Sequence, residues 1–282
     1  MRGAAVSGPE RAPAGVDITK PSVARVYDCY LGGKDNFAVD RAVVEQTRQV
    51  FPVDWDAARG GLDNRAFLRR VVRHLVIEDG IRQFIDFGSG LPTQGNVHEI
   101  AQDIAPQARV VYVDNDPIVL VHARALLGNT ETTQIITADL RRPVEILNDA
   151  TVRGFVDLSR PIGLLSFAIL HHINDEEDPG GIADELRSAM IPGSYLAVSH
   201  FCNPGAAYPE DAARADMCEK IFNEKLGTGR WRTHEEILGY FGDLTIIEPG
   251  LVPLPEWRPD PGDDLSVHPT YRLFVGGVAR KD

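Results

Sequence analysis

The sequence predicts an α/β fold: a doubly wound, mostly parallel sheet of seven strands, preceded by a helical cover and ending in an antiparallel C-terminal hairpin. From residue 84, short apolar segments alternate with amphipathic ones, as in parallel sheets with right-handed helical crossovers. Before that point the periodicity is helical. After residue 199 the alternation ends, and two strand-like segments at 244–248 and 271–279 remain for the hairpin.

The N-terminal region predicts a loose tail and three helices. Residues 1–20 are rich in Ala, Gly and Pro. Apolar residues at helical spacing follow between Ser22, a suitable cap, and Gly32. A second amphipathic stretch covers 39–51, and a third helix begins near Asn64. Its basic residues are expected on the solvent-facing side; they are Arg65, Arg69, Arg70 and Arg73.

The core alternation gives five expected strands, at 84–87, 109–113, 134–137, 162–167 and 195–199. Helices are expected after the first, second and fourth of them, and again near 213–222 and from Thr233. The segment 252–261 is too rich in proline for a strand interior. We therefore expect one domain over 21–282, with a helical cover over 21–80. The core over 81–282 is expected to carry inserted lid segments at about 203–230 and 251–269.

Composition excludes several classes of protein. The 282 residues carry a formal net charge of −12, which disfavours a nucleic acid partner. The three cysteines form no CxxC pair, so neither a disulfide framework nor a metal site is expected. No signal peptide or membrane-length apolar run is visible. We expect a soluble cytoplasmic protein without a membrane partner, and the oligomeric state stays open.

Polar residues at the predicted strand ends indicate a nucleoside ligand. Gly88, Ser89 and Gly90 form a turn between the first strand and its helix, where the backbone can approach a ligand closely. Asp114 ends the second strand, 26 residues after Gly88, at the place of a ribose-binding acid. Asp139 follows the third strand and is either an adenine-binding acid or a helix cap.

The glycine turn departs from the dinucleotide-binding pattern. G-x-G-x-x-G requires a third glycine at position 93, where this chain has Thr93 after Pro92. This departure disfavours a nicotinamide enzyme. S-adenosylmethionine has no pyrophosphate and needs less from the start of the helix.

Two segments carry a resemblance to a known family. They are PSVARVYD with LGGKDNF, over 21–28 and 31–37, and FGSGLPTQGN, over 87–96. The chain resembles class I S-adenosylmethionine-dependent methyltransferases of Rossmann-like fold, and within them a bacterial family of uncharacterised substrate, over roughly residues 20–280. The resemblance implies that the glycine turn holds the methionine part, Asp114 the ribose and Asp139 the adenine. Asn115 and Leu140 would flank the adenine.

The resemblance also implies roles at other strand ends and in the cover. Phe167, at the end of the fourth strand, would pack on the adenosine or shape the methyl channel, and Arg25 or Tyr27 would reach the carboxylate of S-adenosylmethionine. His171, with its neighbour His172, and His200 are general-base candidates, since histidine titrates near pH 6.5. Each could instead cap or pack the fold. Further aromatic residues on loops could form an acceptor pocket: Tyr208, Trp231 and Trp257.

The sequence thus predicts an enzyme that transfers the methyl group of S-adenosylmethionine to a small-molecule acceptor. Two alternatives stay open: a non-catalytic S-adenosylmethionine-binding regulator, and a nicotinamide-dependent oxidoreductase. No catalytic base is unambiguous from the sequence, and the acceptor is not identified.

Overall fold

The computed structural model describes residues 16–91, 95–126 and 130–282. Most of the expected tail, residues 1–15, lies outside the described residues, as do Pro92 and Thr93 of the glycine segment. Within the described residues, no helix has the length and apolar character needed to cross a membrane.

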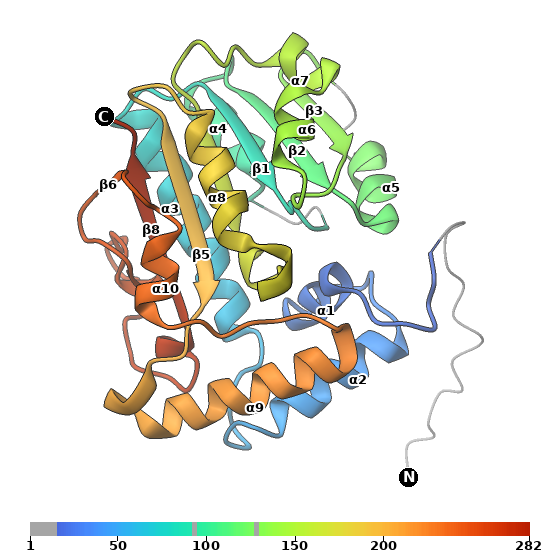
Figure 1. Cartoon of the computed structure of the whole chain (residues 1–282). Helices are drawn as coiled ribbons and strands as arrows, with labels where there is room; N and C mark the ends of the chain where they lie inside the picture. The colour runs from blue at the N-terminus through green and yellow to red at the C-terminus, as the bar shows by residue number, and fades with distance from the viewer. Residues whose placement is uncertain (1–15, 92–94, 127–129) are drawn as a thin grey trace.

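An eight-stranded sheet forms the centre of the molecule (Figure 1). Seven strands follow the order β3-β2-β1-β4-β5-β8-β6, and the two-residue β7 pairs with β8 beside this path. The first five strands are parallel to one another, whereas β8 runs antiparallel to β5, β6 and β7. The strands are β1 Gln83–Phe87, β2 Arg109–Asp114, β3 Thr133–Thr137, β4 Gly163–Phe167, β5 Tyr195–Phe201, β6 Thr245–Ile246, β7 Val252–Pro253 and β8 Phe274–Arg280. The predicted mostly parallel sheet with antiparallel C-terminal strands is confirmed.

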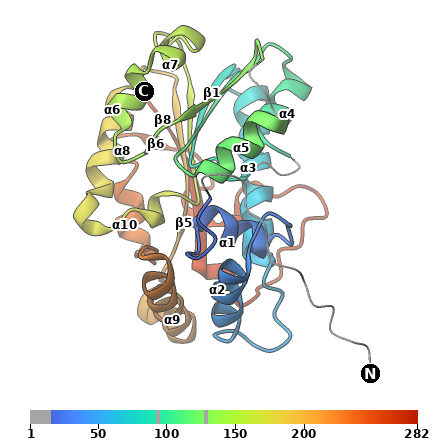
Figure 2. The ribbon, with the colours of Figure 1, turned by 90° about the vertical axis from the view of Figure 1, so that its right-hand side faces the viewer.

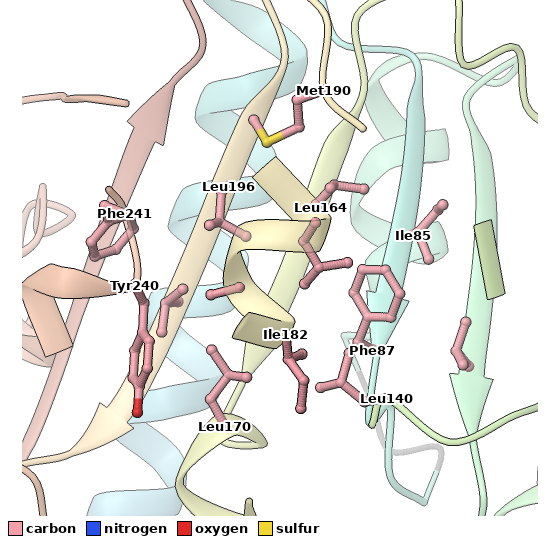
Figure 3. Close-up of a cluster of buried hydrophobic side chains, with 14 of the residues drawn as sticks. Ile85, Phe87, Leu140, Leu164, Leu170, Ile182, Met190, Leu196, Tyr240 and Phe241 are labelled. Atoms are coloured by element: carbon pink, nitrogen blue, oxygen red, sulfur yellow. The ribbon is translucent and has the colours of Figure 1, made fainter. Parts of the chain in front are cut away.

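Helices cover both faces of the sheet (Figure 2). On one face lie α3, α4 and α5, which span Arg59–Ile77, Val97–Ile104 and Pro117–Leu126. On the other lie α6, α7, α8 and α10, which span Pro143–Asn148, Ala150–Phe155, Pro179–Ser188 and His234–Gly239. Apolar side chains fill the space between the sheet and α8, where Ile85, Leu164 and Leu196 meet Ile182 (Figure 3). Because both faces of β1 and β4 are covered, these strands are buried throughout.

Three further helices lie beyond the carboxyl ends of the parallel strands (Figures 1 and 2). They are α1 Val23–Tyr30, α2 Ala38–Arg48 and α9 Pro209–Leu226. Ser22 caps α1 through a hydrogen bond from the Arg25 N–H, as predicted. The contacts between α2 and α9 join the N-terminal helices to the C-terminal part of the chain.

The strand order reverses at β1, which pairs with β2 on one side and β4 on the other. In open α/β sheets, ligands bind outside the carboxyl ends of the strands at such a switch point. The fold therefore predicts a ligand site in the space between the ends of β1 and β4 and the helices α1, α2 and α9.

Two expectations about individual residues are wrong. Arg70 does not face solvent: its side chain is buried, and its guanidinium donates to the carbonyls of Leu254 and Trp257 at 2.7 and 2.8 Å. Arg65 lies beside the cavity described below rather than on an outer face. Only Arg69 and Arg73 of the predicted basic face are about half exposed.

Short elements were also missed. β7 begins the proline-rich segment, where its two residues are enough to pair with β8. The helices α6 and α7, of six residues each, fill the crossover between β3 and β4.

Candidate functional site

A cavity of about 740 Å³ opens at the switch point. Its wall is made by the residues that follow β1, β2, β3 and β4, together with α1, the segment between α2 and α3, the end of β5 and α9. This volume is in the range of pockets that bind small molecules, roughly 300–1,000 Å³. The predicted ligand-binding edge of the sheet is therefore hollow.

The glycine turn after β1 is shaped by internal hydrogen bonds. Gly88 and Gly90 have φ of 67° and 66°, a conformation that favours glycine. The N–H groups of Gly88 and Ser89 donate to the carbonyl of Val113 at 2.8 and 3.3 Å, and the N–H of Gly90 donates to Asp114 at 2.9 Å. Each amide of the turn therefore already has a partner inside the protein.

The start of α4 is likewise occupied by side chains. The N–H of Asn96 donates to Glu99 at 2.7 Å, and the N–H of His98 donates to the Tyr112 hydroxyl at 2.9 Å. A helix N-terminus binds phosphate through free amides and its positive dipole. Here the Tyr112 hydroxyl takes one amide of the first turn, and the Glu99 carboxylate lies at the helix start, which disfavours a pyrophosphate ligand.

Asp114 is held with its carboxylate at the cavity wall. Oδ2 accepts from the N–H of Gly90 and Oδ1 from the N–H of Asp116, both at 2.9 Å. Burial raises the pKa of Asp114, and the two backbone hydrogen bonds act in the opposite direction. Each carboxylate oxygen has further lone-pair capacity, so the group can also accept hydrogen bonds from a diol.

Asn115, Asp139 and Leu140 also line the cavity. The Asn115 side-chain amide donates to Asp139 Oδ2 at 3.2 Å, so the ends of β2 and β3 are joined. Asp139 also forms an ion pair with Arg141 at 3.0 Å. Burial acts to raise the pKa of Asp139, but the hydrogen bonds from Arg141 and Asn115 lower it overall.

Asp86 is a cavity residue that the sequence analysis did not single out. It lies within β1, lines the cavity and is 5% exposed. Burial raises its pKa to about 7; nearby Arg65 opposes this shift and Asp114 adds to it. The sequence did contain a signal for Asp86, which is the lone acid in the apolar run 84–87. A buried carboxyl needs a partner or a function, so such a residue is a site candidate.

The cover brings Arg25 and Tyr27 to the cavity wall, as expected, but both side chains have partners. The Arg25 guanidinium is buried, forms an ion pair with Asp40 at 2.8 Å and donates to the carbonyl of Lys20. The Tyr27 hydroxyl accepts from the Asn64 amide at 3.0 Å and donates to the carbonyl of Gly61 at 3.3 Å. These contacts hold α1 against α2 and α3.

Phe167, the last residue of β4, and His171, which follows that strand, line the cavity. The backbone N–H of Phe201 donates to Nδ1 of His171 at 3.2 Å, so a neutral ring carries its proton on Nε2. Burial and the neighbouring His172, His200 and Arg232 hold the pKa of His171 well below its usual range. In this state the ring can donate from Nε2, but it has no free lone pair with which to accept a proton.

His200 is not among the described residues that line the cavity. Its side chain is fully buried; Nδ1 lies 2.7 Å from the carbonyl of Phe201, and Nε2 lies 3.4 Å from Arg232. Burial lowers its pKa to about 3. His172 lines the cavity, and burial likewise lowers its pKa to about 3.

Of the three loop aromatics expected in an acceptor pocket, only Trp231 lines the cavity. Trp257 is fully buried in the core against Phe67, and Tyr208 is 46% exposed outside the cavity. The expectation was wrong for these two. Further aromatic residues at this end were missed; they are Tyr30, Phe51, Trp55, Phe201 and Phe222. They come from segments far apart in sequence and share no local pattern.

Comparison with known proteins gives three findings. A family model described as S-adenosyl methyltransferase matches residues 9–282. A candidate methyltransferase from Thermobifida fusca is 42% identical, with a TM-score of 0.88 and coverage of 96% of this chain and 98% of that one. A DUF574 family protein from Streptomyces avermitilis is 37% identical, with a TM-score of 0.86 and coverage of 94% and 99%.

More distant structures share the fold alone. An O-methyltransferase family 2 protein from Planctomyces limnophilus is 15% identical, with a TM-score of 0.50 and coverage of 87% of this chain and 62% of that one. No curated protein sequence matches this chain.

Proposed function

Because this chain belongs to the S-adenosyl methyltransferase family, we propose that it transfers the methyl group of S-adenosylmethionine to a small-molecule acceptor held in the same cavity. One observation carries the proposal: a single cavity joins the carboxylates at the ends of β1, β2 and β3 to an aromatic-lined region beneath α9. One end suits a nucleoside, and the other has room for a second molecule.

The residues present fit S-adenosylmethionine. Asp114 retains lone pairs for the two ribose hydroxyls. The amides of the glycine turn are used internally, which suits a ligand without a pyrophosphate. We assign the methionine part to the turn Gly88–Gly90, with Asp86 close to it as a carboxyl that can ionise near neutral pH.

The adenine would lie between the ends of β2 and β3. Asn115 and Leu140 line this part of the cavity, and Asp139 can accept a hydrogen bond from an exocyclic amine. The ion pair between Asp139 and Arg141 holds this carboxylate in place without using all of its lone pairs. Phe167 would contribute an apolar ring at the wall between the adenosine and the acceptor.

When bound, S-adenosylmethionine supplies a methyl group on a positively charged sulfur, so the chemistry requires mainly alignment with the acceptor. The residues of this chain would bind both molecules, orient them and exclude water. His171 would act as a hydrogen-bond donor through Nε2 rather than as a base, since its other ring nitrogen accepts from the Phe201 N–H. Arg25 would line the cavity wall and hold α1 to α2 through its ion pair with Asp40. Its charge would therefore be balanced within the cover.

Calorimetry with S-adenosylhomocysteine, the demethylated product, tests the proposal. We expect saturable binding, weakened at least tenfold in Asp114→Ala, because a charge-assisted hydrogen bond contributes about 1.5–3 kcal/mol. Asp103→Ala is the matched control, since Asp103 is exposed on α4 and does not line the cavity. Absence of binding at millimolar ligand would refute the cofactor assignment. Cofactor binding without methyl transfer to any compound of a broad acceptor panel would instead favour the non-catalytic alternative.

A further inference from the structure

We propose that the acceptor is a flat, uncharged aromatic molecule that binds against the aromatic wall of the cavity, defined as Tyr30, Phe51, Trp55, Phe201, Phe222 and Trp231. The inference rests on the proposed function, because it names the acceptor class of the same site. Six rings from α1, the α2–α3 segment, β5, α9 and the α9–α10 segment meet at one end of the cavity.

The rings of the aromatic wall are arranged as stacked pairs. Phe51 and Trp55 stack with ring centroids 4.0 Å apart, and Phe201 and Trp231 stack at 4.2 Å. Phe222 meets the Trp231 ring edge-on at 5.3 Å. Offset-stacked and edge-to-face contacts are the arrangements that aromatic rings prefer. A flat aromatic ligand can extend this pattern, whereas a saturated ring presents no π face.

The charged residues that line the cavity come from other segments than most rings of the aromatic wall. Among the described residues that line the cavity, the charged side chains belong to positions 17–25, 65–116 and 139–141. The lining segments 26–64 and those after position 141 contribute no Asp, Glu, Lys or Arg. The aromatic wall belongs to the remaining segments. Burial also keeps its titratable neighbours neutral, since it lowers the pKa of His172 to about 3 and raises that of Cys218 to about 12. A charged acceptor would lose its hydration here without an opposite charge in return.

Two hydrogen-bond donors beside the aromatic wall favour an acceptor that carries oxygen. The indole N–H of Trp55 is buried and has no partner among the described residues. His171, whose ring stacks on Phe201 at 3.6 Å, carries its proton on Nε2, which has no hydrogen bond to the part of the chain that the structure describes. An aromatic compound with a hydroxyl group matches both features of this region.

Calorimetry in the presence of saturating S-adenosylhomocysteine tests the inference with two probes, 2-naphthol and its saturated analogue decahydro-2-naphthol. We expect 2-naphthol to bind at least tenfold more tightly. Phe222→Leu should weaken 2-naphthol binding severalfold and leave the affinity for S-adenosylhomocysteine unchanged. Phe241→Leu is the matched control, because Phe241 is equally buried but lies in the core away from the cavity.

The outcomes separate the two proposals. Equal affinity for the two probes, with intact S-adenosylhomocysteine binding, overturns the aromatic acceptor and leaves the proposed function standing. Failure of the wild-type protein to bind S-adenosylhomocysteine overturns the proposed function and with it this inference. If Phe222→Leu does not fold, Phe51→Leu removes another ring of the wall, one from the α2–α3 segment, and is expected to have the same effect.

Discussion

Gly88 and Gly90 share a backbone conformation and differ in their surroundings. Both have φ near +67°, but a Cβ at position 88 would lie 2.5 Å from the Ile169 side chain, while one at 90 would meet nothing within 4 Å. We expect Gly90→Ala to lower the free energy of unfolding by about 1–2 kcal/mol, the cost of a side chain in this region. Gly88→Ala should lose a further ~1–3 kcal/mol by overpacking. Urea denaturation of both variants measures the difference, and equal losses would contradict the contact with Ile169.

We expect Asp86 to make cofactor binding depend on pH. With a pKa of about 7, the carboxyl is neutral below that pH and ionised above it. S-adenosylmethionine carries a sulfonium and an ammonium group, so its affinity should rise with pH between about 6 and 8. Calorimetry over this range measures the slope. The groups facing Asp86 are Arg65 on α3 and both Tyr112 and Asp114 on β2.

Asp86→Asn provides the control for this prediction. The amide keeps the size of the side chain and removes its ionisation, so the affinity should vary less with pH than in the wild-type protein. A wild-type affinity that stays constant from pH 6 to pH 8 would contradict the prediction. A slope that the variant fully retains would assign the pH dependence to another group.

At the scale of single elements, α3 is held by residues almost 200 positions away. The buried Arg70 guanidinium donates to the carbonyls of Leu254 and Trp257 and pairs with Asp263. We expect Arg70→Ala to lower the free energy of unfolding by about 3–5 kcal/mol, because it leaves buried acceptors unpaired. Arg69→Ala, which removes a half-exposed partner of Asp260, should cost less than about 1 kcal/mol. Denaturant titrations measure the free energy of unfolding of both variants. Similar losses would contradict the prediction that the buried contacts of Arg70 stabilise the fold more than those of Arg69.

The same helix explains what could be predicted from sequence. The core strands were placed to within about one or two residues, since buried parallel strands read as short apolar runs. Helical periodicity identified α3, but periodicity cannot tell a solvent-facing arginine from one that meets a distant loop. Trp257 was misassigned for the same reason: its burial against Phe67 depends on how the C-terminal segment returns to α3.

At the scale of the whole molecule, the strand-end part of the cavity could be predicted from sequence, and its aromatic part could not. The residues at the strand ends that the sequence analysis named, from the glycine turn to Asp139, all line the cavity, because parallel strands bring their carboxyl ends together. The aromatic wall could not be predicted, since it requires knowing that α2 packs beside α9. His200 was named because it follows the predicted fifth strand, 195–199. In the structure it lies within β5, where side chains alternate, and it faces Tyr240 rather than the cavity.

Polar contacts continue from the N-terminal cover to the centre of the sheet. The Ala168 N–H donates to the Ser199 hydroxyl at 2.9 Å, and that hydroxyl donates to Asn64 Oδ1 at 2.6 Å. The Asn64 amide then donates to the hydroxyl of Tyr27 at 3.0 Å. We propose that these contacts make the cover and the core, residues 21–282, one cooperative unit, because Asn64 joins the Tyr27 hydroxyl to the Ser199 hydroxyl.

A double-mutant cycle tests this cooperation. Tyr27→Phe removes one neighbour of Asn64 and Ser199→Ala removes the other, so the two losses in unfolding free energy should be non-additive by about 0.5–3 kcal/mol. Tyr27→Phe combined with Tyr195→Phe is the control, because the Tyr195 hydroxyl bonds Asp79 at the opposite end of β5. This control pair should be additive within about 0.5 kcal/mol. Additive losses in both pairs, or separate unfolding transitions for cover and core, would mean that α1 rests on the sheet as an independent element that can open without loosening the strand ends beneath it.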